Sequence, residues 1–310
     1  MAEAIARVGE IDICYETFGD SSDPAILLIM GLGTQMLAWH EDFCEQLAAR
    51  GYFVIRHDNR DIGRSSRIAD APVPTLKQLA LRDKRAAAYT LSDMASDSVG
   101  VLDHLGIEQA HIVGASMGGM IAQRVAIEHP DRTLSLTSIM SNTGSFWSGQ
   151  PALTMYAFLL RPAPKERNAY IDRAVDSFVK IGGKGFEPDV EDLRDIATRS
   201  YDRGHDPRGS ARQLGAIVAD RDRGPELRKL RVPTTVIHGA DDRLVPRSGG
   251  RATAKVIPGS TYVEISGMGH GLPRGAWRRI IGAIVQNAEL AGGRANPESR
   301  SAPRQAATAG

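Results

Sequence analysis

A serine flanked by glycines is the first residue in this sequence that could carry out chemistry. Gly114-Ala-Ser-Met-Gly118 has the form G-x-S-x-G; it follows an apolar run that ends at Val113 and precedes a helix predicted from about Gly119. In this setting a sharp turn lifts the serine above the edge of a sheet, where side chains at 114 and 118 would collide. We therefore predict that Ser116 is a nucleophile.

A serine hydroxyl is a weak nucleophile at neutral pH, so a base has to take its proton. His270 lies in the glycine-rich stretch 266–271, just after the strand-like run Thr261–Ile265, and it is the last of the eight histidines. This position agrees with the chain order serine, acid, histidine, and we predict His270 as the base. His104 and His129 lie on predicted helices, and His111 and His238 lie at strand ends. The remaining histidines, His40, His57 and His205, do not have the place in the chain that this order requires.

The third group required is a carboxylate that orients the imidazole and stabilises its charged form. Asp241 and Asp242 both follow the strand-like run Thr234–Ile237 and would lie on the loop above the sheet. The chemistry alone does not choose between these two acids.

An oxyanion hole needs two N–H donors. The turn at the nucleophile directs the N–H of Met117 into the site, at the start of a helix. Met30-Gly-Leu-Gly33 ends a continuously apolar run, and the N–H of Leu32 is the natural second donor. A plain structural turn is the alternative interpretation of that segment.

Strand-like and helix-like segments alternate along the chain. Amphipathic stretches include a helix after the capping box Thr90–Asp93, with Gly106 at its end, and a helix over Ala122–His129 that Pro130 stops. This alternation predicts an α/β fold with a mainly parallel sheet and helices on both faces. The predicted strands are Ile11–Phe18, Ala25–Met30, Tyr52–Arg56, Ala110–Val113, Thr133–Met140, Thr234–His238 and Thr261–Ile265.

The alternation stops between about residues 141 and 231, where helical patches occur without a strand-like run. We predict that residues 1–140 and 232–290 form the core and that 141–231 is a helical cap, with ordinary crossover helices as the alternative. Residues 291–310 are rich in Ala, Gly, Ser, Pro and Arg without periodicity, which predicts a disordered tail.

Composition narrows the classes of function. The 38 basic and 37 acidic residues leave a formal net charge of +1, so neither nucleic acid nor an anionic membrane is an expected partner. Cys14 and Cys44 lack metal-like spacing and are expected to be reduced thiols. No signal peptide and no transmembrane run is visible, so we expect a cytoplasmic protein. No motif for a metal or a nucleotide occurs, and no cofactor is expected.

Five sequence motifs occur in a fixed order along the chain: M-G-L-G at 30–33, D-N-R-D-I-G-R-S at 58–65, G-A-S-M-G-G at 114–119, H-G-A-D-D-R-L-V-P at 238–246 and G-M-G-H at 267–270. In these motifs and their order the chain resembles the α/β-hydrolase superfamily, over all of its length but the C-terminal tail. Within it, the chain is most similar to the branch with aclacinomycin methylesterase and related actinobacterial lipase/esterase proteins.

The resemblance implies a mostly parallel eight-stranded sheet with a helical cap. It also implies Asp242 as the third catalytic residue, with Asp241 as runner-up, and Leu32 and Met117 as oxyanion donors. Many relatives carry a histidine where this chain has Met30, but only the backbone N–H of Leu32 is needed, so we expect the hole to be retained. The 58–65 segment fits a buried structural turn.

These residues lead us to expect a serine hydrolase that cleaves small-molecule carboxylic esters, as a carboxylesterase, methyl esterase or lipase-like enzyme. The alternatives on the same fold are a thioesterase, a lactonase, an acyltransferase and a cofactor-free perhydrolase. The alternative from another class is a ligand receptor with negligible turnover. Four apolar residues near the start of the predicted cap could line the substrate pocket or form the cap's own core: Phe146, Trp147, Met155 and Phe158.

Overall fold

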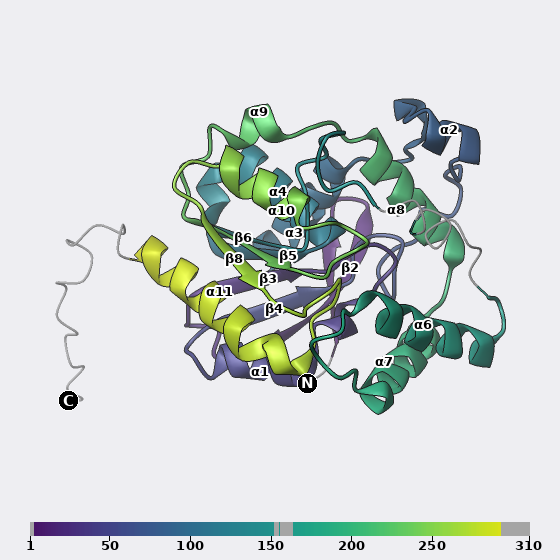
Figure 1. Cartoon of the computed structure of the whole chain (residues 1–310), viewed down its shortest axis with the longest axis horizontal. Helices are drawn as coiled ribbons and strands as arrows, with labels where there is room; N and C mark the ends of the chain where they lie inside the picture. Colours follow the sequence, from purple (N-terminus) through teal and green to yellow (C-terminus); the bar gives the residue numbers. More distant parts are fainter. Residues whose placement is uncertain (1–2, 152–154, 156–163, 293–310) are drawn as a thin grey trace, which may run out of the picture.

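The computed structural model describes residues 3–151, 155 and 164–292. An eight-stranded sheet lies at the centre of the molecule, in the order β1-β2-β4-β3-β5-β6-β7-β8 (Figure 1). β2 pairs antiparallel with β1 and β4, and the other neighbours are parallel, which confirms the predicted α/β class. The strands are β1 Ala4–Val8, β2 Ile11–Phe18, β3 Ala25–Ile29, β4 Phe53–His57, β5 Ala110–Ala115, β6 Thr133–Ile139, β7 Thr234–Gly239 and β8 Thr261–Ile265.

Helices cover both faces of the sheet, so its central strands are buried on both sides. Helices α3 (Leu91–His104) and α4 (Met117–Glu128) cover one face, and α1 (Glu41–Ala48) and α11 (Trp277–Gly292) cover the other (Figure 1). In β3, Leu27 and Ile29 belong to the core on the first face, whereas Ile26 and Leu28 belong to the core on the second. The continuous apolar run is therefore a strand with two buried faces. A further helix beside the sheet is α10, Ser248–Val256.

Local signals end the helices where the sequence predicts. Thr90 caps α3 and forms the capping box with Asp93, and Gly106, with φ +68°, follows the helix. Pro130 begins a 3₁₀ turn directly after α4. The edge strand β1 is absent from the predicted strands, because its small residues and the half-exposed Ile5 make a weak pattern.

Between β6 and β7, the part of the chain that the structure describes includes the helices α6 Arg167–Ile181, α7 Val190–Arg203, α8 Pro207–Ala219 and α9 Gly224–Leu227. The described part of residues 141–231 contains no strand. Residues 152–154 and 156–163 of the predicted cap lie outside the described residues. The predicted tail 291–310 starts two residues too early, because Ala291 and Gly292 continue helix α11, and its other residues lie outside the described ones. The short helix α2, Leu76–Ala80, precedes α3.

Buried ion pairs join α7 and α8 to the loop after β4. Arg203 of α7 donates to Asp58 at 2.8 Å, and Arg212 of α8 donates to both oxygens of Asp61 at 2.7 and 2.8 Å. Asp61 and Arg212 are both inaccessible to solvent. The acids of the 58–65 segment therefore hold the helices that follow β6 against the core, which agrees with the structural role expected for that segment.

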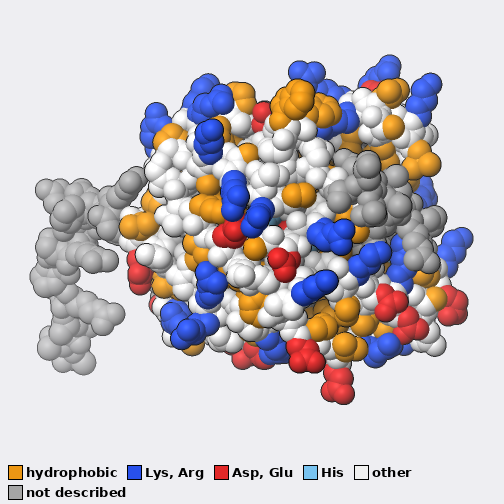
Figure 2. Space-filling view, viewed as in Figure 1, with side chains coloured by type: hydrophobic (Ala, Val, Ile, Leu, Met, Phe, Trp, Pro, Cys, Tyr) orange, Lys and Arg blue, Asp and Glu red, His pale blue; other side chains and the backbone are white. Residues whose placement is uncertain are grey.

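The surface mixes charges, as the near-equal numbers of acidic and basic residues lead one to expect. Figure 2 shows acidic and basic side chains intermixed over the face that carries α6 and α7. Within the described ranges, none of the helices combines the length and the apolar character that a bilayer crossing requires. Cys14 and Cys44 are both buried and unbridged.

Candidate active site

Ser116 lies on a strained turn between β5 and α4. Its φ of 58° and ψ of −121° are unusual for a residue with a side chain, and such strain commonly marks functional positions. A Cβ at Gly114 would lie 2.0 Å from the carbonyl oxygen of Gly118, and a Cβ at Gly118 would lie 2.0 Å from that of Ile29. The two glycines therefore permit the close backbone approach that this turn needs.

Replacing Gly118 by alanine is expected to destabilise the protein by about 3 kcal/mol or more, because the added carbon meets backbone that cannot move aside. Urea unfolding followed by circular dichroism measures this loss. The matched control is Gly282→Ala in α11, where an added Cβ meets nothing within 4 Å. An unfolding free energy for Gly118→Ala equal to that of the control would contradict the tight turn.

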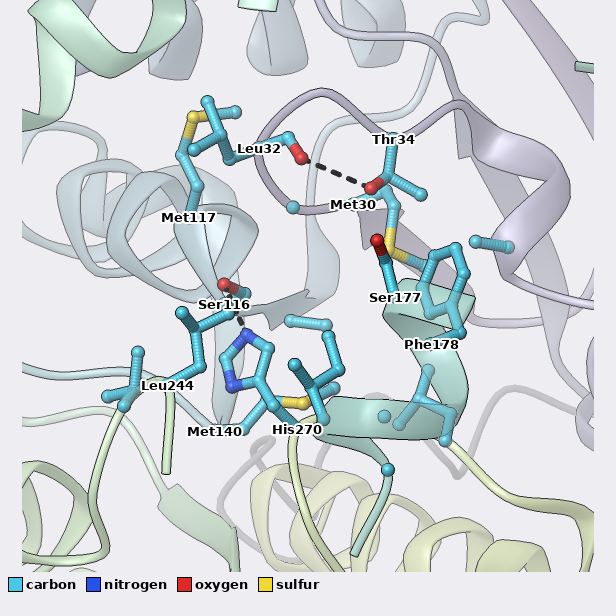
Figure 3. A pocket seen from close by; sticks show the side chains of 18 of the residues that line it. Met30, Leu32, Thr34, Ser116, Met117, Met140, Ser177, Phe178, Leu244 and His270 are labelled. Atoms are coloured by element: carbon cyan, nitrogen blue, oxygen red, sulfur yellow. Dashed lines mark hydrogen bonds between the residues drawn. The ribbon is translucent and has the colours of Figure 1, made fainter. Parts of the chain in front are cut away.

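A chain of hydrogen bonds joins Ser116, His270 and Asp242. The Nε2 atom of His270 lies 2.9 Å from Oγ of Ser116 (Figure 3). Its Nδ1 atom lies 2.7 Å from Oδ2 of Asp242. Of the two adjacent acids, Asp242 is buried and makes this contact, whereas Asp241 is exposed. An ionised carboxylate only accepts, so Nδ1 donates to Asp242 and Nε2 is free to accept the proton of the serine.

Asp242 is held ionised by its surroundings. Its Oδ1 atom accepts the backbone N–H groups of Leu244 and Val245 at 2.9 and 2.8 Å, and His238 lies 3.5 Å from Oδ2. Burial by itself would raise the pKa of Asp242, but the charge of His270 and the hydrogen bonds from His238 and His270 outweigh it and lower the pKa to about 2. The carboxylate therefore stays charged at any pH at which an esterase is assayed.

This depressed pKa predicts how stability depends on pH. The folded value of about 2 lies below the ordinary value of 3.8, so ionised Asp242 stabilises the fold above about pH 4, and this contribution is lost as the pH falls through about 2. Between about pH 5 and pH 2 the protein should lose about 2 kcal/mol more unfolding free energy than Asp242→Asn. Denaturant titrations at both pH values measure the difference, and equal losses would contradict it.

The buried histidines away from Ser116 have local structural partners. His57 lies 3.3 Å from the hydroxyl of Ser98, and burial lowers its pKa to about 4. His238 donates from Nε2 to the carbonyl oxygen of Val245 at 2.7 Å. Of the histidines in the described ranges, only His270 lies within hydrogen-bonding distance of the serine. No cluster of His, Cys, Asp and Glu side chains in the described ranges is arranged to hold a metal ion.

The M-G-L-G turn lies directly against the serine. A Cβ at Gly31 would be 3.0 Å from Cβ and 3.5 Å from Oγ of Ser116, so no larger residue fits without displacing the serine. Among the described residues, the backbone N–H groups of Leu32 and Met117 have no hydrogen-bond acceptor. Two unpaired donors therefore flank the serine, from the end of β3 and the start of α4.

A cavity of about 1140 Å³ opens from Ser116 and His270. Figure 3 shows Met117 and Phe178 on opposite sides of it. A space of this size accepts a substrate considerably larger than a short acyl ester. Apolar side chains that line it come from the strand ends and from residues 141–231: Met30, Leu32, Met117, Met140, Phe178, Ile181, Phe186, Leu193, Ile196 and Leu244.

The apolar residues predicted for this pocket differ in their positions. Phe146 lines the cavity, where the guanidinium of Arg82 lies 4.2 Å from its ring centre. Trp147 is 96% exposed, Met155 is buried, and neither is among the described residues that line the cavity. Phe158 lies outside the described residues.

Met30 and Met140 are among the lining residues that the sequence-based search for a pocket missed. Met30 and Met140 directly follow β3 and β6 and reach the cavity beside Ser116 (Figure 3). In parallel sheets, ligands bind beyond the carboxyl ends of the strands. The position directly after a predicted strand is therefore the signal that would have found both.

Curated relatives resemble this chain over most of its length. Rhodomycin D methylesterase DauP of Streptomyces sp. strain C5 is 29% identical over 304 residues, which cover 91% of this chain and 96% of that protein. The 3-oxoadipate enol-lactonase 2 of Acinetobacter baylyi is 27% identical over 253 residues, which cover 81% of this chain and 84% of that protein. Both names describe enzymes of ester or lactone chemistry.

A solved structure and a family model agree on the fold. An esterase from Thermogutta terrifontis superposes with a TM-score of 0.71 at 22% identity, covering 94% of this chain and 99% of that one. The model of the alpha/beta hydrolase fold family matches residues 24–273, which include Ser116, Asp242 and His270. With an eight-stranded sheet in the same chain, these findings establish that the protein belongs to the α/β-hydrolase family.

Proposed function

We propose that this protein hydrolyses carboxylic esters through an acyl-enzyme formed on Ser116. The observation that supports this most directly is the hydrogen-bonded series Ser116–His270–Asp242, at 2.9 and 2.7 Å, whose first two members line a large apolar cavity. Such a series can activate a serine hydroxyl, and the cavity can hold an apolar ester beside it.

In the first half of the reaction, Nε2 of His270 takes the proton of Ser116 as Oγ forms a bond to the ester carbonyl carbon. The carbonyl oxygen becomes an oxyanion, which the N–H groups of Leu32 and Met117 bind. Each such donor contributes about 10²–10³ to turnover. Asp242 stabilises the imidazolium that forms. His270 then gives its proton to the departing alkoxide, the carbon–oxygen bond breaks, and the alcohol leaves.

In the second half, water takes the place of the alcohol. His270 removes a proton from the water, whose oxygen bonds to the acyl carbon, and the same two N–H groups bind the second oxyanion. The bond to Oγ breaks, His270 returns a proton to Ser116, and the carboxylic acid leaves. No atom is gained or lost by the enzyme over the cycle.

The relatives support ester hydrolysis and also favour a second candidate, a lactone substrate. One relative is named a methylesterase and another an enol-lactonase, at similar identity to this chain. A lactone is a cyclic ester, so the same residues would open its ring, but the alcohol would stay attached to the acid. Alkali uptake in a pH-stat without release of a separate alcohol distinguishes a lactone from a simple ester.

Two measurements test the proposal. A fluorophosphonate probe should form one adduct, and peptide mass spectrometry should map it to Ser116. A p-nitrophenyl ester should give a burst of p-nitrophenol followed by a slower steady rate, because this activated ester acylates the enzyme faster than water removes the acyl group. A receptor with negligible turnover would instead bind ligands without a steady rate, and an adduct at another residue would overturn the assignment of the nucleophile.

A further inference from the structure

The loop that carries His270 is bonded on one side to the end of helix α6. The backbone N–H of His270 donates to the carbonyl oxygen of Ile181 at 2.7 Å, and the N–H of Gly269 donates to that of Gly182 at 2.8 Å. The last carbonyl groups of a helix have no partner within the helix. Here the loop of the catalytic histidine supplies those partners.

A third bond and tight packing extend this contact. The N–H of Gly185 donates to the carbonyl oxygen of Gly267 at 2.9 Å. A Cβ at Gly183 would lie 2.4 Å from that same oxygen and 2.5 Å from the nitrogen of Gly269. Gly183 also has a φ of +92°, which favours glycine. The two backbones therefore touch without room for any side chain between them.

The same helix lines the substrate cavity. Ser177, Phe178 and Ile181 of α6 border the space, and Figure 3 shows Ser177 and Phe178 across it from Met117. A substrate in the cavity thus touches the helix whose end holds the backbone of His270. On its other side the loop is bonded to the core, where the N–H of Asp241 donates to the carbonyl oxygen of Met268 at 2.9 Å.

From these contacts we infer that the turn Gly182–Gly185 is a positioning element for His270, which holds the imidazole at its distance from Ser116. This inference rests on the proposed function, since it concerns the base of that reaction. The turn acts through the histidine and touches no reacting atom. A displacement of about 1 Å in a catalytic group can cost about 10²-fold in rate, so a small shift of this turn has a large expected effect.

The test is Gly183→Ala, whose added carbon pushes the loop of His270. We expect kcat for p-nitrophenyl butyrate to fall about 10- to 100-fold with KM nearly unchanged, and the rate of fluorophosphonate labelling to fall in proportion. The matched control is Gly51→Ala, which has a similar φ of +81° but open space around the added carbon. It carries the same backbone strain and should keep the kcat of the unaltered protein.

A second variant and a spectroscopic measurement keep the inference open to refutation. In Gly185→Ala the added Cβ would meet only Gly267, 2.4 Å from its Cα atom. This variant replaces Gly183→Ala in the test if Gly183→Ala does not fold. The downfield proton NMR signal of the Nδ1–H group of His270, bonded to Asp242, should shift in either variant but not in Gly51→Ala. An unchanged kcat and signal in a folded variant, or a rise in KM alone, would overturn the inference.

The two proposals fail separately. If the unaltered protein neither turns over esters nor reacts with the fluorophosphonate, the proposed function is wrong, and the imidazole signal still reports whether the turn positions His270. If the unaltered protein is active and the glycine variants retain its kcat, the positioning inference alone is wrong.

Discussion

Replacing Ser116 by alanine is expected to lower kcat for p-nitrophenyl esters by about 10⁴- to 10⁶-fold, because the covalent route needs Oγ. The residual rate would come from the oxyanion donors and from substrate binding. Steady-state kinetics with high enzyme concentration measures the loss. The fold should persist, since among the described residues the Ser116 hydroxyl bonds only to His270.

The control for this variant is Ser96→Ala on the exposed face of α3, where the hydroxyl bonds only to a carbonyl of its own helix. It should match the unaltered protein in turnover and in fluorophosphonate labelling, whereas Ser116→Ala should not be labelled. Ester turnover by Ser116→Ala within tenfold of the unaltered rate would remove the basis of the proposed mechanism.

Replacing Asp242 by asparagine is expected to lower kcat by about 10⁴-fold. The amide can keep the bonds from Leu244 and Val245 through its oxygen, but its NH₂ group then faces Nδ1 of His270. The imidazole is driven to carry its proton on Nε2, where it can no longer accept one from Ser116. Steady-state kinetics at constant pH measures the effect.

Asp241→Asn is the matched control, because Asp241 is adjacent in sequence, exposed, and has no contact with the imidazole. It should have the kcat of the unaltered protein. If Asp241→Asn instead caused the large loss and Asp242→Asn did not, the carboxylate that orients His270 would have been wrongly assigned.

Much of the fold is predictable from the sequence because buried strands make continuous apolar runs and capped helices carry short polar signals. β3 and the capped start of α3 are the clearest examples. β1 could not be predicted in the same way, since an edge strand made of Ala4–Val8 buries few large side chains. Its position depends on pairing with β2, which no local pattern encodes.

The candidate site was predictable to different degrees for different residues. Ser116 and His270 lie among glycines that the turns require, so the sequence alone points to them. Asp241 and Asp242 could not be separated by chemistry, because the bend of one loop buries one and exposes the other. The contact between Gly183 and Gly269 joins segments far apart in the chain, and only the folded structure reveals it.

Asp58 links two segments that border the cavity at Ser116, the turn after β3 and helix α7. One of its oxygens accepts the N–H of Met36, which follows the turn bearing Leu32, and the other binds Arg203 of α7 at 2.8 Å. The hydrogen bonds of this buried carboxylate thus limit how far the turn after β3 and helix α7 can move apart. Met30 and Met140 line the cavity next to Ser116, and their unbranched side chains can change rotamer, so rotation of these thioethers offers a way to fit ligands of different size without moving the backbone.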